Sequence, residues 1–96
     1  MSDSEIAALI NQRRRQILVH SIIYYRMNDN LIEDYEWANL GKELMFLQEK
    51  YPDFAETCVY ADDFKDFDCS TGQNLPLDDE WAINKAKQLL AMRNSR

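Results

Sequence analysis

The chain contains few side chains that could carry out a covalent reaction. His20 is the only histidine, and no serine or cysteine motif accompanies it, which is typical of a packed or hydrogen-bonded histidine rather than a general base. Cys58 and Cys69 lie 11 positions apart with no histidine nearby, a poor pattern for zinc. We therefore expect no catalytic residues, no metal site and no enzymatic activity from this chain on its own.

One loop has part of the spacing of a calcium site. Asp66, Asp68, Ser70 and Gly72 alternate with other residues, as the early ligands of a calcium loop do. The glycine comes one position late, however, and Leu77 stands at the twelfth position where such loops carry glutamate. The pattern favours an ordinary polar loop.

Charge is unevenly distributed along the chain. The net charge is −6, which argues against direct binding of nucleic acid, because phosphate contacts require Lys and Arg. Arg13, Arg14 and Arg15 form a basic cluster. Acidic residues gather between positions 62 and 80, namely Asp62, Asp63, Asp66, Asp68, Asp78, Asp79 and Glu80. This acidic stretch is either a solvated face or a docking surface for a basic partner.

Length and composition indicate a single, mainly α domain over residues 1–96. A chain with 46% hydrophobic residues can build a core, and two glycines and two prolines are too few for the turns of a β-rich fold. No signal segment or membrane-spanning run is visible. We expect a cytoplasmic protein that has reduced thiols and no contact with a membrane.

Two long antiparallel helices are expected first, joined as a hairpin. Ser2 and Glu5 form a capping box, and apolar residues then recur at helical spacing over residues 4–27. Asn28, Asp29 and Asn30 are turn residues, and Asp34 is the expected N-cap of the second helix. That helix has an apolar stripe of Trp37, Leu40, Leu44, Leu47 and Tyr51.

A third helix is expected at the C-terminus. Pro52 should end the second helix. The irregular segment 54–77 could hold short helical turns or a short strand pair. Asp78 or Asp79 should cap a helix over residues 78–93.

The loop end of this hairpin resembles a known family. Tyr24 and Tyr25 end the first helix, and Asp34, Glu36 and Trp37 follow the loop. Together with Ile32, Leu40, Glu43, Leu44, Leu47 and Pro52, these residues fall in register with the N-terminal segment of bacterial NAD-dependent DNA ligases. The resemblance covers about residues 13–53.

The resemblance implies a binding role. In that family the hairpin holds the nicotinamide mononucleotide half of NAD, while the lysine of a neighbouring domain takes the AMP. Tyr24, Tyr25, Asp34 and Trp37 would line this site here. Aromatic faces and a carboxylate suit a flat cationic pyridinium ring, at about 0.5–2 kcal/mol for each cation–π contact.

The chain departs from the family at two positions and in one motif. Trp37 replaces a tyrosine and could still stack on a ring. Ala38 replaces an aspartate and cannot accept a hydrogen bond, a loss of about 1–3 kcal/mol. No Lys-x-Asp-Gly adenylation motif is present, so we do not expect ligation from this chain alone.

Two functions remain open at this point. One is a noncatalytic ligase-like domain that binds NAD or nicotinamide mononucleotide, or assists a separately encoded nucleotidyltransferase. The other is a small acidic interaction or inhibitor protein of phage type, with segment 62–80 as its contact surface. The alternative to any binding role of the four residues is that Tyr24, Tyr25 and Trp37 are hairpin core and Asp34 is only a helix cap.

Overall fold

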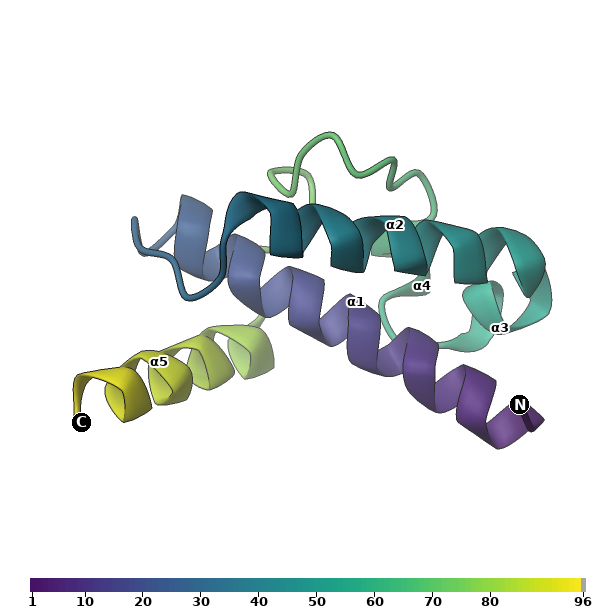
Figure 1. Ribbon diagram of the computed structural model, residues 1–96, viewed down its shortest axis with the longest axis horizontal. Coiled ribbons are helices and arrows are strands. Elements are labelled where there is room, and N and C mark those ends of the chain that lie inside the picture. The colour runs from purple at the N-terminus through teal and green to yellow at the C-terminus, as the bar shows by residue number, and fades with distance from the viewer. Residues whose placement is uncertain (96) are drawn as a thin grey trace.

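Two long helices packed side by side form the body of the protein. The computed structural model describes residues 1–95, with α1 over Asp3–Tyr25 and α2 over Asp34–Lys50. The predicted hairpin is confirmed, and α1 lies between α2 on one side and α5 (Glu80–Asn94) on the other (Figure 1). The predicted mainly α class is also confirmed, since residues 1–95 contain no β-strand.

Helix caps follow the sequence with one exception. The Ser2 hydroxyl accepts from the Glu5 N–H at 3.2 Å, and the Asp79 carboxylate accepts from the Ala82 N–H at 3.0 Å, as expected. The prediction that Asp34 caps α2 is wrong. Glu33 holds that position because its N–H donates to the Glu36 side chain at 3.0 Å, and Asp34 becomes the first helical residue, where the helix dipole favours a carboxylate.

Short helices occupy part of the segment whose structure the sequence left open. The α2 helix ends before Pro52, as predicted, and the proline then begins α3 (Pro52–Thr57), a position that suits its fixed φ. A single turn, α4, covers Ala61–Phe64. The segment from residue 65 to 79 then runs past α2 before it reaches α5 (Figure 1).

The core contains an arginine that the sequence placed on the surface. Its apolar members come from α1, α2, α4, α5, the end of α3 and the loop before α5: Ile6, Ile10, Ile17, Leu18, Val19, Ile22, Ile23, Leu44, Leu47, Cys58, Phe64, Leu75, Ala82 and Ala86. Arg14 is only 1% exposed, so the predicted basic cluster Arg13–Arg15 does not form one solvated patch.

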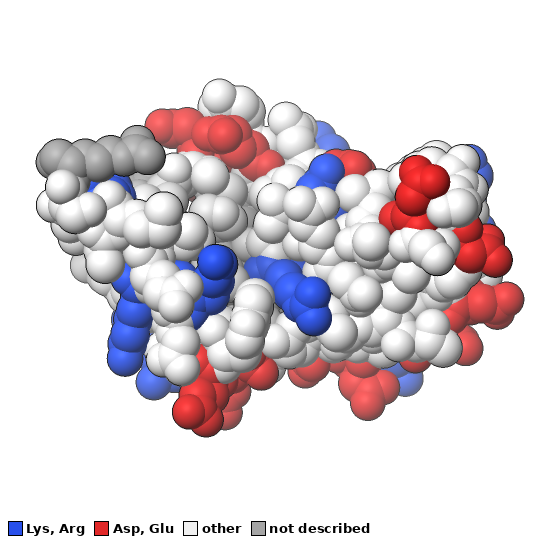
Figure 2. Space-filling view, turned by 90° about the horizontal axis from the view of Figure 1, so that it is seen from below, with Lys and Arg blue, Asp and Glu red and all other residues white. Residues whose placement is uncertain are grey.

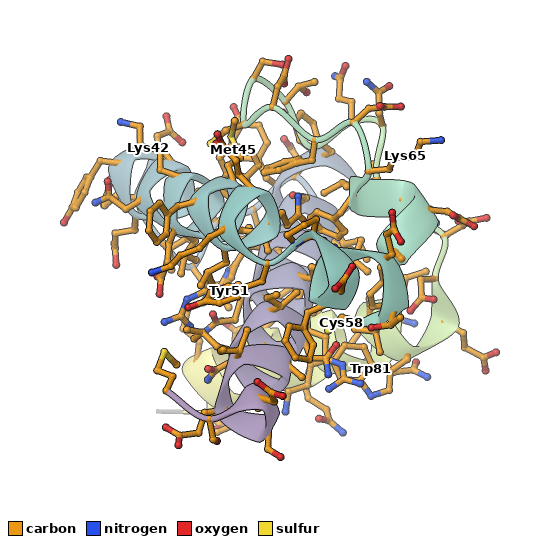
Figure 3. All side chains as sticks on the ribbon, turned by 90° about the vertical axis from the view of Figure 1, so that its right-hand side faces the viewer. Lys42, Met45, Tyr51, Cys58, Lys65 and Trp81 are labelled. Carbon is orange, nitrogen blue, oxygen red and sulfur yellow. The ribbon has the colours of Figure 1, made fainter. Side chains whose placement is uncertain are left out.

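The guanidinium of Arg14 joins α1 to the segment after α2. It donates to the Gln48 side chain at 3.0 and 2.8 Å and to the carbonyls of Ala55, Cys58 and Val59 at 2.7–3.2 Å. Figure 3 looks at this end of the molecule, where Tyr51 follows α2 and Cys58 follows α3. We call Arg14 and these four partners the Arg14 site. Because every buried donor finds an acceptor, the burial of this charge is tolerated.

The helices described here are not of the membrane-spanning kind: over residues 1–95, none is both long and apolar enough to cross a bilayer.

Candidate ligand-binding pocket at the loop end of the hairpin

The four residues predicted to bind a ligand line one pocket. Tyr24 and Tyr25 come from the last turn of α1, and Asp34 and Trp37 from the first turn of α2; with Ser21 they enclose about 210 Å³. We call this hollow the loop-end pocket. The short loop over residues 26–33 brings the two helix ends together, so residues far apart on an extended chain share one site.

The two tyrosines are surface residues rather than core. Tyr24 is 54% exposed and Tyr25 is 37% exposed. Their rings meet edge to face, with centroids 4.9 Å apart and planes at 86°. The alternative that both tyrosines fill the hairpin core is therefore wrong, whereas its statement that Trp37 packs against the core is confirmed. An exposed pair of ring faces beside a carboxylate can receive a flat cationic group.

Trp37 is held in a fixed orientation. Its indole N–H donates to the Ser21 hydroxyl at 3.2 Å, and Ser21 in turn donates to the Ile17 carbonyl at 2.7 Å. Phe67 packs edge to face against the indole, with centroids 6.0 Å apart. Because the indole N–H is already satisfied, what Trp37 offers to the pocket is its ring.

The loop before α5 contacts two of the residues that line the pocket, Tyr25 and Ser21. The Thr71 and Tyr25 hydroxyls are 3.1 Å apart and hydrogen-bonded. A Cβ added at Gly72 would lie 2.9 Å from the Ser21 Cβ and closer still to the Ser21 hydroxyl. Only glycine allows the chain to approach Ser21 this closely. The sequence did not predict a role for Thr71 and Gly72, because no local pattern indicates contacts with Tyr25 and Ser21 about 50 positions away.

His20 borders the loop-end pocket on its other side. It lines a small hollow of about 30 Å³ together with Tyr24, Asp34 and Trp37. Its Nδ1 is buried and finds no hydrogen-bond partner among residues 1–95. Burial lowers the pKa of His20 from its ordinary value, although nearby Glu36 opposes this. The imidazole is therefore neutral at pH 7 and is packed, as the sequence indicated.

The carboxylate of Asp34 and the position of Ala38 differ in their surroundings. Asp34 lies on the exposed side of α2 and lines the pocket. Ala38 does not line it, and its carbonyl accepts from the Cys69 thiol at 3.5 Å. The next turn of α2 carries Gly41, where any Cβ would collide with the Cys69 sulfur. Small residues at 38 and 41 thus accommodate the loop that crosses α2.

Comparison with known proteins identifies one related region. Over 50 residues, 52% of its length, the chain is 34% identical to a DNA ligase of Methylococcus capsulatus (strain ATCC 33009 / NCIMB 11132 / Bath). This chain carries a DNA-ligase-like region. The match spans 7% of the length of that ligase. No protein-family model and no solved structure matches the chain.

Proposed function

We propose that the ligase-like region makes this chain a noncatalytic domain that binds the nicotinamide mononucleotide half of NAD in the loop-end pocket. The observation that carries the proposal is the convergence of Tyr24, Tyr25, Asp34 and Trp37 on one hollow. These are the positions to which the resemblance assigns nucleotide binding. The 96 residues include no Lys-x-Asp-Gly motif. Binding, or assistance to a separately encoded nucleotidyltransferase, is therefore proposed rather than ligation.

The size and chemistry of the pocket fit one pyridinium ring. Sites for drug-sized ligands enclose roughly 300–1,000 Å³, so about 210 Å³ suits a single ring with the rest of the nucleotide outside. The aromatic faces supply cation–π attraction, and Asp34 supplies the negative charge that a pyridinium ring requires. When bound, nicotinamide mononucleotide would contribute that cationic ring.

Calorimetry with nicotinamide mononucleotide, NAD and reduced nicotinamide mononucleotide tests the proposal. The reduced ring is similar in size but carries no positive charge. If cation–π contacts drive binding, the oxidised form should bind about 2- to 30-fold more tightly than the reduced form. Equal affinity for the two forms, or no heat with millimolar oxidised ligand, would contradict the proposal.

Two aspartate variants locate the site. Asp34→Asn removes the charge that faces the ring and should weaken binding about tenfold. Asp53→Asn removes an equal charge from the first turn of α3, outside the pocket, and should leave the affinity unchanged. Equal losses in both variants would show that net charge, and not the pocket, attracts the ligand.

The acidic stretch supports a second candidate function, an interaction with a basic partner. Asp62, Asp63, Asp66 and Asp68 line one hollow of about 450 Å³. Hydrogen bonds from the Ser70 side chain and backbone lower the pKa of Asp68. Four converging carboxylates favour a basic surface as the occupant.

Charge reversal tests this second candidate. Capture of a protein partner should weaken steeply with salt and should be lost when Asp62, Asp63 and Asp66 are changed to Lys. A partner that the triple variant still captures would contradict a role for this hollow. Nucleotide binding at the loop-end pocket should be unaffected by the same changes.

A further inference from the structure

A groove lies between α1 and α5, apart from the loop-end pocket and from the hollow lined by Asp62, Asp63, Asp66 and Asp68. It encloses about 600 Å³. One wall is a row of α1 side chains at helical spacing, Gln12, Arg15 and Val19, and the other is a row on α5, Trp81, Lys85 and Leu89. Two such rows side by side form a trough whose long axis follows the helices.

The groove is basic although the protein is acidic. Arg15 and Lys85 line it and no carboxylate does, in a chain whose net charge is −6. Among residues 1–95, neither cation takes part in an ion pair. Figure 2 shows the face that carries α1 and α5, with Lys and Arg in its middle and Asp and Glu mostly around its margin. An occupant with negative charge is therefore favoured at the centre of this face.

The aromatic residue in the groove is exposed and stacked. Trp81 is 48% exposed, and the Arg15 guanidinium lies 5.6 Å above its ring. Trp and Arg are the residues that most often dominate the energy of protein–protein interfaces, particularly where they are desolvated together. Leu89 lies beside them and is half-buried, so Trp81 and Leu89 offer apolar surface next to the charges of Arg15 and Lys85.

We propose that the α1–α5 groove binds an acidic amphipathic helix of a partner protein. From Ala8 to Val19 the α1 wall is about 16 Å long at about 1.5 Å per residue, which accommodates roughly three turns of a docked helix. Apolar side chains of that helix would pack against Trp81 and Leu89. Flanking Asp or Glu residues would pair with Arg15 and Lys85. This arrangement is the helix-in-groove mode of recognition.

The experiment uses the full chain and two synthetic stapled helices of about 14 residues. Both carry the same apolar stripe, flanked by Glu in one peptide and by Lys in the other. The acidic peptide should bind at least about tenfold more tightly than the basic one, measured by calorimetry. Amide chemical-shift changes should concentrate on residues 8–20 and 81–89.

Matched double variants keep the net charge equal. Arg15→Glu with Lys85→Glu should weaken the acidic peptide by at least about tenfold and should bind the basic peptide better than the parent protein does. Lys42→Glu with Lys87→Glu changes the net charge by the same amount at exposed positions outside the groove and should have little effect. Figure 3 places Lys42 on the far side of α1 from Trp81. Circular dichroism should be used to check that both variants fold.

Three results would overturn the proposal. The first is equal binding of the two peptides, or no binding of either at millimolar concentration. The second is a set of shifts centred on the loop-end pocket or on residues 62–68 instead of the groove. The third is concentration-dependent self-association that Arg15→Glu with Lys85→Glu abolishes, because the occupant would then be a second copy of this chain.

Discussion

The Arg14 site and the loop-end pocket lie along the same pair of helices. They differ in how far their polar and aromatic side chains are buried and hydrogen-bonded. At the Arg14 site a single guanidinium is 1% exposed and donates to four partners. At the loop-end pocket Tyr24 and Tyr25 remain exposed, and the Asp34 side chain accepts no hydrogen bond within residues 1–95. The first site uses all the donors of its guanidinium for internal contacts, whereas the second leaves the Asp34 carboxylate and the tyrosine rings available to a ligand, although Tyr25, Trp37 and Ser21 bond internally there.

This difference separates stability from binding. A buried charge with all its donors satisfied contributes to the fold only while its partners are in place. An exposed carboxylate beside ring faces contributes little to the fold and can change its contacts when a ligand arrives. We therefore expect variants at the Arg14 site to alter the free energy of unfolding, and variants at the loop-end pocket to alter ligand affinity.

The largest expected effect is at Arg14. Arg14→Met removes the donor that satisfies the carbonyls of Ala55, Cys58 and Val59. Each buried acceptor left unpaired costs about 1–3 kcal/mol, so the free energy of unfolding should fall by about 3 kcal/mol or more. Urea denaturation followed by circular dichroism measures this change.

Arg13→Met is the matched control for that variant. Arg13 pairs with Glu43 at 2.9 Å, and the Glu43 side chain is 42% exposed. Such pairs contribute about 0–1 kcal/mol. If the two arginine variants lose equal stability, Arg14 does not have the structural role described here.

The next effect is expected at Gly72, where the loop contacts the loop-end pocket. Gly72→Ala should lower the free energy of unfolding by about 1–3 kcal/mol, since overpacking forces neighbouring groups apart. The new methyl group would collide with Ser21, which also orients Trp37. Weaker nucleotide binding should therefore accompany the loss of stability. A second change, Ser21→Ala, should restore part of the stability by removing the hydroxyl.

Tyr60 should produce a smaller, pH-dependent effect. Its hydroxyl donates to the Asp79 carboxylate at 3.0 Å, and burial together with this bond raises the pKa of Tyr60 to about 12. The folded state therefore favours the neutral phenol. This contribution is complete below pH 10 and should be lost as the pH rises towards 12. Tyr60→Phe should lower stability by about 1 kcal/mol at pH 7 and should abolish this part of the alkaline loss in urea titrations.

The smallest expected effect is at His20, beside the loop-end pocket. Burial lowers the pKa of its imidazole, so the unfolded chain takes up a proton more readily than the folded protein. Stability from this residue is present above the ordinary pKa of about 6.5 and is lost as the pH falls below it. Unfolding free energies measured between pH 7 and pH 5 should show a decline that His20→Gln removes. If the His20→Gln variant shows the same decline in unfolding free energy, groups other than His20 are responsible for it.

Much of the fold was predictable because a helix requires particular residue types at positions close together in the sequence. The apolar stripe of α2, the capping box at Ser2 and the cap at Asp79 depend on residues three or four positions apart, and the structure confirms each of them. The Asp34 cap was wrong because Glu33 and Glu36 compete for the same turn. The sequence alone does not show which of the three adjacent arginines is buried, because burial depends on carbonyls more than 40 positions away.

The composition of the loop-end pocket was predictable for a similar reason. A short loop between two helices must bring Tyr24 and Tyr25 near Asp34 and Trp37, whatever the rest of the chain does. The contacts of Thr71 with Tyr25 and of Gly72 with Ser21 were not predictable, because they join segments about 50 positions apart.

The helices, the hairpin and the ring and carboxylate side chains at its loop end could be predicted from the amino-acid sequence, because they follow from spacing within a few turns. The exposure of the tyrosines, the burial of Arg14 and the basic groove between α1 and α5 could be seen only in the folded molecule. Those outcomes depend on which helix faces meet. Helix faces meet according to packing across the whole chain, and local periodicity does not encode that choice.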